Sequence, residues 1–189
     1  KKKKSYGAYY LGRAKLQAVM GNADKATEDY HMCVSLDKSC YAAYLGQYLL
    51  QIDSGDEQGA SATLEAAMNV AGDKQKESVE YYTLLYYNKD TDNAGAGFKA
   101  LYDNGEKKAA YYLGRIAEDA KDYNSAASYY EIYQTECPDE LGADFYNQYA
   151  GCLIELEKYD EALELITKGK QMAQGTVGQR ILFNEVIIY

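Results

Sequence analysis

A repeat of 34 residues is the feature that most restricts how this 189-residue chain can fold. Shifting the sequence against itself by 34 positions aligns six identical pairs: Tyr10 with Tyr44, Leu11 with Leu45, Gly12 with Gly46, Gln17 with Gln51, Gly21 with Gly55, and Ala26 with Ala60. The alanine series continues through Ala94, Ala126 and Ala162, where steps of 32 and 36 residues sum to two periods. Self-similarity at a fixed period of this length is typical of repeat architectures.

Each repeat is predicted to contain two α-helices. Pro138 is the only proline, and apolar residues recur at helical spacing, as in Tyr123, Ala126, Ala127, Tyr130 and Tyr133. One series of turn signals, including GNAD, GDEQ and LEKYD, divides each unit, and a second series, including LDKS and ECPD, separates successive units. A helix pair of this size has too little core to fold alone, so we expect the pairs to stack.

We therefore predict an all-α fold, an α-solenoid of stacked antiparallel helix pairs over residues 1–189. The expected units span about residues 5–38, 39–72, 73–105, 106–138 and 139–174, with the first helix of a sixth unit at 177–189. That last segment includes the apolar run ILFNEVIIY. We expect natural sequence to continue beyond both ends, and an exposed helix of this kind to promote self-association.

Small residues are predicted to let the two helices of a unit approach closely. In the fourth unit the spacing places Gly114 on the first helix opposite Ala126 on the second, which allows a short interaxial distance. Tyr123 and Tyr130 are expected to fill the space above and below that small pair. Pro138 ends the second helix.

These residues resemble the signature of the tetratricopeptide repeat family. The fourth unit has Leu113-Gly114, Tyr123, Ala126, Tyr130 and Pro138 at the signature positions, and the fifth has Tyr146, Tyr149-Ala150, Tyr159, Ala162 and Ile166. In the first two units the Leu-Gly pair precedes the repeated alanine by two residues more than the family pattern. The resemblance covers nearly the whole chain and implies a right-handed superhelix whose first helices line an inner, concave surface.

Charge and hydropathy restrict the partners. The formal net charge of −9 would repel phosphate over most of the surface, so we predict no nucleic-acid partner. No stretch approaches the roughly 18 uninterrupted apolar residues of a membrane span. The compartment stays open, since the chain is compatible with a cytoplasmic protein and with an exported or lipoprotein-anchored one whose signal lies elsewhere.

Motifs that could carry chemistry do not withstand inspection. GAGFKA (95–100) has the glycine spacing of a dinucleotide loop but no preceding strand, and DTDNAG (90–95) opens like a calcium loop but has Leu101 where a bidentate glutamate is needed. The single histidine, His31, is interpreted as a surface residue. We predict a non-enzymatic protein with no cofactor and no metal.

The four cysteines show no metal-ligand spacing and are interpreted as buried or half-buried thiols. A disulfide between Cys33 and Cys40 is conceivable, although nothing in the spacing requires it.

Tyrosine is unusually abundant, with 22 residues against three Phe and no Trp. Adjacent tyrosines on a helix lie about 100° apart, so both members of a doublet cannot enter the same seam. Given the concave surface that the resemblance implies, we predict partner-binding rings and polar contacts there: Tyr9, Tyr86, Tyr111 and Tyr112, with Arg13, Gln47, Arg115 and Asn147 beside them. The family's carboxylate clamp is not carried over, because Arg115 and Gly151 stand where it has asparagines.

The leading hypothesis is a scaffold that holds a peptide or a helix of a partner protein in a tyrosine-lined groove. One alternative is a glycan-binding protein of a bacterial cell surface, since aromatic rings stack on sugars, although the lack of Trp counts against it. Another is the recognition arm of a larger enzyme.

Overall fold

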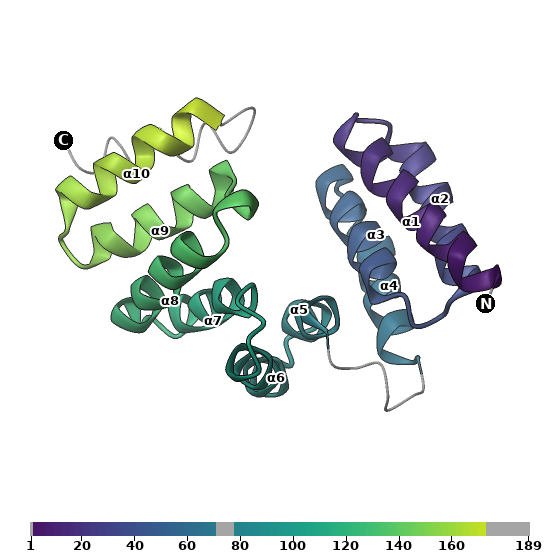
Figure 1. The fold of residues 1–189 in the computed structure, drawn as a ribbon, viewed down its shortest axis with the longest axis horizontal. Helices are drawn as coiled ribbons and strands as arrows, with labels where there is room; N and C mark the ends of the chain where they lie inside the picture. Colours follow the sequence, from purple (N-terminus) through teal and green to yellow (C-terminus); the bar gives the residue numbers. More distant parts are fainter. Residues whose placement is uncertain (1, 71–77, 173–189) are drawn as a thin grey trace. The chain divides into compact units, whose positions relative to one another are not determined.

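The computed structural model describes residues 2–70 and 78–172, with side chains described from Tyr6 onward. These residues form ten α-helices and one 3-10 helix, without any strand (Figure 1). The helices are α1 (Lys2–Val19), α2 (Ala23–Leu36), α3 (Tyr41–Ser54), α4 (Glu57–Met68), α5 (Val79–Tyr87), α6 (Thr91–Asp103), α7 (Ala109–Asp119), α8 (Tyr123–Glu136), η1 (Pro138–Glu140), α9 (Ala143–Glu155) and α10 (Tyr159–Met172). The predicted all-α class is confirmed.

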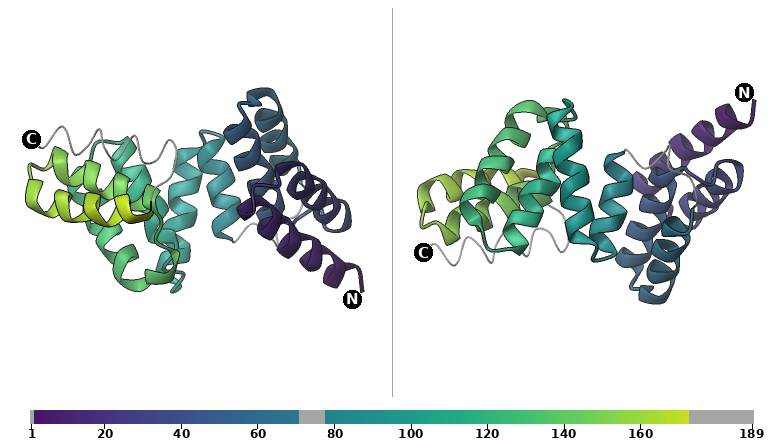
Figure 2. Two further views of the ribbon diagram at one scale, coloured as in Figure 1. Left: turned by 90° about the horizontal axis from the view of Figure 1, so that it is seen from above. Right: turned by 90° about the horizontal axis from the view of Figure 1, so that it is seen from below.

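Helices that follow one another in the sequence pack together as pairs. Contacts join α1 to α2, α3 to α4, α7 to α8 and α9 to α10, and successive pairs meet where α2 contacts α3 and α8 contacts α9. Figure 2 shows the members of such a pair lying side by side and joined by a short turn. The prediction of stacked helix pairs is therefore confirmed as well.

The chain divides into two compact units, Lys1–Gly97 and Phe98–Tyr189, with the boundary inside α6. Each unit has its own buried core. The expected helix at 177–189, and the self-association predicted for it, lie outside the described residues. Among the described helices, none combines the length and apolar character that a membrane span requires.

The turn inside each pair places one residue in the left-handed backbone region. These residues have φ between +59° and +77° and are Gly21, Gly55, Lys89, Lys121 and Glu157. Their spacing of 34, 34, 32 and 36 residues equals that of the repeated alanines, so the backbone carries the same period as the sequence. Only the first two of these positions hold glycine, the residue that adopts this conformation without steric penalty.

Side-chain caps start several of the helices after these turns. Asp56 accepts a hydrogen bond from the Gly59 amide at 2.9 Å, and Asp122 accepts one from the Ser125 amide at 3.1 Å. Such caps satisfy amide groups that have no partner within the helix.

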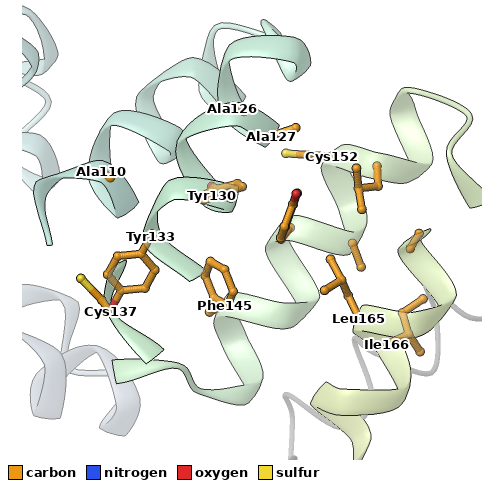
Figure 3. Close-up of a cluster of buried hydrophobic side chains, with 14 residues drawn as sticks. Ala110, Ala126, Ala127, Tyr130, Tyr133, Cys137, Phe145, Cys152, Leu165 and Ile166 are labelled. Carbon is orange, nitrogen blue, oxygen red and sulfur yellow. The ribbon is translucent and has the colours of Figure 1, made fainter. Parts of the chain in front are cut away.

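The core of the second unit is rich in aromatic rings. Tyr130, Tyr133, Phe145 and Tyr149 are buried between α7, α8 and α9, and alanines and aliphatic residues complete the cluster toward α10 (Figure 3). The Tyr130 and Phe145 rings meet edge to face at 6.0 Å between centroids, an arrangement that the aromatic quadrupole favours.

The ring of Tyr130 packs directly against Gly114. A Cβ placed on Gly114 would lie 2.5 Å from Cε1 and 2.7 Å from Cδ1 of Tyr130, so the ring of Tyr130 occupies the space that a side chain at position 114 would need. Ala126 is buried, but it is Tyr130 that occupies the space beside Gly114. The sequence predicts Tyr130 beside this small pair, and its ring lies there.

The same arrangement occurs twice in the first unit. A Cβ on Gly46 would overlap the Tyr30 ring, and a Cβ on Gly97 would overlap the Tyr82 ring. Gly97 belongs to the GAGFKA stretch, which lies inside α6. Its glycine therefore has a packing role in this structure.

The four cysteines are free thiols, three of them buried and Cys40 half-buried, as expected. The sulfur atoms of Cys33 and Cys40 lie 3.1 Å apart as a hydrogen-bonded pair without a disulfide. Burial, together with Cys40, raises the pKa of the Cys33 thiol to about 12.

Candidate partner-binding site

The eight predicted site residues fall into two separate groups. Tyr9, Arg13, Gln47 and Tyr86 belong to the first unit, whereas Tyr111, Tyr112, Arg115 and Asn147 belong to the second. The candidate site therefore has one part in each unit, and the second unit brings more of its members together.

A hydrogen-bonded cluster joins α7 to α9 in the second unit. Tyr111 and Arg115 lie one helical turn apart on α7, and Gln148 reaches them from α9. In the amide orientation that satisfies its neighbours, Gln148 Oε1 accepts from Arg115 Nε at 3.1 Å and from Nη1 at 3.0 Å, and Nε2 donates to the Tyr111 hydroxyl at 2.7 Å. Arg115 Nη1 also lies 3.4 Å from that hydroxyl. The opposite orientation would face the amide nitrogen toward the guanidinium donors, so the network selects this one.

Tyr111 contributes its hydroxyl to the cluster while its ring belongs to the core. The ring centroid lies 5.3 Å from that of Tyr133 and 6.4 Å from that of Phe145. Burial raises the pKa of the Tyr111 hydroxyl, and the nearby Arg115 charge acts in the opposite direction. The Tyr111 ring thus packs within the second unit while its hydroxyl takes part in the hydrogen-bonded cluster, and its role in partner binding stays a prediction.

The ring of Tyr112 packs face to face against a ring of α6 in the same unit. It stacks on Phe98 of α6 with centroids 4.8 Å apart and planes 4° from parallel. Adjacent tyrosines on α7 thus point in different directions, as the doublet geometry predicts, but both rings pack against protein.

Glu118 lies next to this cluster on α7. It accepts a 2.6 Å hydrogen bond from the buried Tyr130 hydroxyl. Burial raises the pKa of Glu118, while the Tyr130 hydrogen bond and Arg115 act to lower it. Half-buried Asn147 precedes Gln148 on α9. Helix α7 thus supplies a guanidinium (Arg115) and a carboxylate (Glu118), and α9 supplies two carboxamides.

The first unit contains a second polar cluster, on α1 and α2. Arg13 donates to both carboxylate oxygens of Asp29, at 2.6 and 2.5 Å, and to the Tyr9 hydroxyl at 3.3 Å. The Asp29 side chain is 5% exposed, and its hydrogen bonds to Arg13 lower its pKa. Tyr9 is 57% exposed, whereas the Arg13 guanidinium is paired with Asp29; partner binding by either residue stays a prediction.

Two predicted contacts of the first unit are buried. Tyr86 is 8% exposed and Gln47 is 7% exposed, so each side chain presents only a small part of its area to solvent. Both expectations came from the implied placement of first helices on a concave surface. A role for either residue in partner binding stays a prediction.

Gln148 is the candidate site residue that the sequence did not reveal. A signal was present, since Asn147-Gln148 is the one pair of adjacent carboxamides in the otherwise apolar stretch FYNQYAGCLI. For metal chemistry, the part of the chain that the structure describes holds no group of three or more His, Cys, Asp or Glu side chains suited to an ion.

Comparison with known proteins identifies the fold. No family model and no curated protein sequence matches this chain. Among solved structures, a thermophilic tetratricopeptide repeat protein of Thermus thermophilus has a TM-score of 0.66 at 12% identity, covering 95% of this chain and 99% of that one. A tetratricopeptide repeat protein of Parabacteroides merdae has a TM-score of 0.65 at 16% identity, covering 95% and 69%.

The APC/C hetero-tetramer Cut9–Hcn1 is a third similar structure, with a TM-score of 0.66 at 12% identity over 95% of this chain and 36% of the other. At these identities the likeness concerns the fold. The chain has the helix-pair fold of tetratricopeptide repeat proteins, as its residues indicated.

Proposed function

We propose that this chain, with the fold of tetratricopeptide repeat proteins, is a non-catalytic scaffold that binds an extended segment of a partner protein. The proposed site is the surface formed by Tyr111, Arg115, Asn147 and Gln148, called here the α7–α9 surface. The observation that carries the proposal is the hydrogen-bonded network in which Gln148 joins Arg115 and Tyr111 across two successive helix pairs.

This network suits peptide recognition because its polar groups are held in place before a partner arrives. Arg115 and Gln148 are half-buried, and the rotamer of each is fixed by the other and by Tyr111. Side chains that are already ordered lose less conformational entropy on binding. Arginine and tyrosine are also among the residues most enriched at interaction hot spots.

The chemistry of the surface indicates what the partner segment offers. A guanidinium binds carboxylates and main-chain carbonyls, and a carboxamide donates and accepts at once, as a peptide group does. An extended segment with an acidic side chain or main-chain carbonyl toward Arg115 and peptide groups along Asn147 fits this set.

The similarity to a chain of the Cut9–Hcn1 hetero-tetramer supports a protein partner, since that protein is assembled with another. Glycan binding gains no support from this surface. Stacking on a sugar needs an open ring face, and the rings of Tyr111 and Tyr112 pack against Tyr133 and Phe98.

The test is a selection of binders from a displayed library of random dodecapeptides, followed by affinity measurement on variants. Arg115→Gln, Asn147→Ala and Gln148→Ala are each expected to weaken binding by about tenfold or more, equivalent to about 1.4 kcal/mol. Lys168→Gln, which removes one positive charge from the exposed side of α10, is the matched control and should leave affinity unchanged. Binders that tolerate all three substitutions would refute this assignment.

A further inference from the structure

Two cysteines of the first unit meet where one helix pair joins the next. Cys33 lies in the last turn of α2, and Cys40 directly precedes α3 as its N-cap residue. Their sulfur atoms are 3.1 Å apart. Neither residue belongs to the α7–α9 surface, so what this pair of thiols can do is independent of the proposed partner binding.

The connection between the two helices holds the sulfurs in this position. The Asp37 amide donates to the Cys33 carbonyl at 2.9 Å, and the Cys40 amide donates to the Asp37 carbonyl at 3.1 Å. The Asp37 carboxylate in turn accepts from the Ser39 amide at 3.1 Å and from the Ser39 hydroxyl at 2.8 Å. Because this turn is hydrogen-bonded at both cysteines, joining their side chains costs little further chain entropy.

The environments of the two thiols differ. Cys33 is 0% exposed and packs among Ala26, Tyr30 and Ala43, whereas Cys40 is half-buried and packs against the same cluster. A reagent in solution therefore reaches Cys40 first. Burial and the contact with Cys40 raise the pKa of Cys33 to about 12, so this sulfur stays protonated at neutral pH.

Packing of the repeat does not require a cysteine at either position. Counted from the repeated alanine of each second helix, the residues equivalent to Cys33 in the next three units are Ala67, Leu101 and Tyr133. The residues equivalent to Cys40 in the third and fourth units are Lys108 and Glu140. The paired thiols are therefore a feature of the first repeat and not of the repeat pattern.

We propose that Cys33 and Cys40 are a site of reversible oxidation, at which a disulfide-bonded oxidant such as oxidised glutathione joins the two sulfurs and locks α2 to the start of α3. The sulfurs approach from 3.1 Å to the usual bond length of about 2 Å. The bond couples the α1–α2 pair to the α3–α4 pair, which the interface between neighbouring units otherwise holds without a covalent cross-link.

The reaction consists of two thiol–disulfide exchanges. The Cys40 thiolate attacks one sulfur of oxidised glutathione, the glutathione S–S bond breaks, and the glutathione thiolate that leaves takes up the proton that Cys40 gave up. The Cys33 sulfur then attacks the Cys40 sulfur of the mixed disulfide, and its proton goes to the second glutathione thiolate as that group leaves. The two cysteines lose two electrons in total, and one glutathione disulfide becomes two glutathione thiols.

Tryptic mapping of the full chain detects the bond directly. Lys38 lies between the two cysteines, so trypsin separates them unless a disulfide holds the two peptides together. After incubation with oxidised glutathione, we expect linked peptides that dithiothreitol separates, and a fall in free thiols from four to two. The melting temperature should rise by about 5 °C or more, because the bond restricts the unfolded chain, and should return to its first value on reduction.

Two cysteine variants provide the comparison. Serine suits the N-cap position of α3, so Cys40→Ser should fold normally and show neither linked peptides nor a rise in melting temperature on oxidation. Cys137→Ala removes a buried thiol of the second unit and should still show both. The proposal is overturned if the linked peptides do not form, if glutathione stays attached to Cys40, if oxidation instead joins two chains, or if the bond forms and leaves the melting temperature unchanged.

Discussion

Replacing Gly114 by alanine tests the packing of the second unit most directly. In a helix interior, alanine is normally more stable than glycine by about 1 kcal/mol. At position 114, however, the added methyl group would lie 2.5 Å from Cε1 of Tyr130. The outcome therefore depends on whether that ring can move away.

The surroundings of the Tyr130 ring oppose such a movement. Its hydroxyl is held by Glu118 at 2.6 Å, and its ring lies 5.8 Å from Tyr149 and 6.0 Å from Phe145 between centroids. Overpacking a filled core costs about 1–3 kcal/mol, and a ring confined on several sides belongs near the upper end. Subtracting the gain in helix propensity leaves an expected destabilisation of about 2 kcal/mol for Gly114→Ala.

Urea denaturation followed by circular dichroism measures this change, with Gly151→Ala as the matched control. Gly151 lies inside α9 of the same unit, and a Cβ there would contact nothing within 4 Å, so this variant should gain about 1 kcal/mol. In a Tyr130→Leu background the penalty of Gly114→Ala should largely disappear. If Gly114→Ala is as stable as Gly151→Ala, the ring is not held against the glycine and the packing described here is incorrect.

Three further substitutions probe caps, hydrogen bonds and charge. Tyr130→Phe should destabilise the protein by about 1.5–3 kcal/mol in urea denaturation, because it removes a hydrogen bond to a carboxylate. Tyr41→Phe should be neutral or stabilising, because the Tyr41 hydroxyl is buried without a hydrogen-bond partner among the described residues. Equal effects of the two substitutions would contradict both assignments. Lys121→Gly should raise the stability by about 0.5–1 kcal/mol, since its φ of +60° suits glycine, and a loss measured in the same assay would count against the left-handed turn. Ionised Asp29 stabilises the folded state above its ordinary pKa of 3.8, and this stabilisation is lost as the pH falls through the lowered pKa of the folded state. The melting temperature should therefore fall with pH in that acidic range, and Arg13→Met should make this dependence of melting temperature on pH less steep. An unchanged pH dependence in the variant would exclude the Arg13–Asp29 pair as its cause.

Much of the fold was predictable from the sequence because local signals repeat. The turns that contain Gly21 and Gly55 are evident from the sequence, since glycine and polar residues stand between two apolar stretches. The Asp56 cap follows the turn at Gly55, and the Asp122 cap follows the equivalent turn at Lys121. The left-handed conformation of Lys121 was not predictable in the same way, because lysine as a residue type gives no left-handed signal.

The candidate site was less predictable, because helical spacing fixes the direction of a side chain and not what it meets. Tyr111 lies on α7, the first helix of its pair, yet its ring packs against Tyr133 while its hydroxyl bonds to Gln148. Gln148 belongs to the same cluster from 37 residues away, a pairing that depends on how two helix pairs stack. Gln47 shares its repeat position with Arg115 and is nevertheless buried, since its neighbours on α2 and α4 differ.

The glycines that receive tyrosine rings also restrict how the helices can slide. A ring that occupies the notch left by a missing side chain has one matching position along the opposite helix, and a shift by one residue would drive it into a Cβ atom. Gly46, Gly97 and Gly114 therefore fix how neighbouring helices are aligned along their axes. Other residues of these interfaces can be substituted while the alignment of the helices is retained. A substitution of one of these glycines needs a simultaneous change in the tyrosine that packs against it.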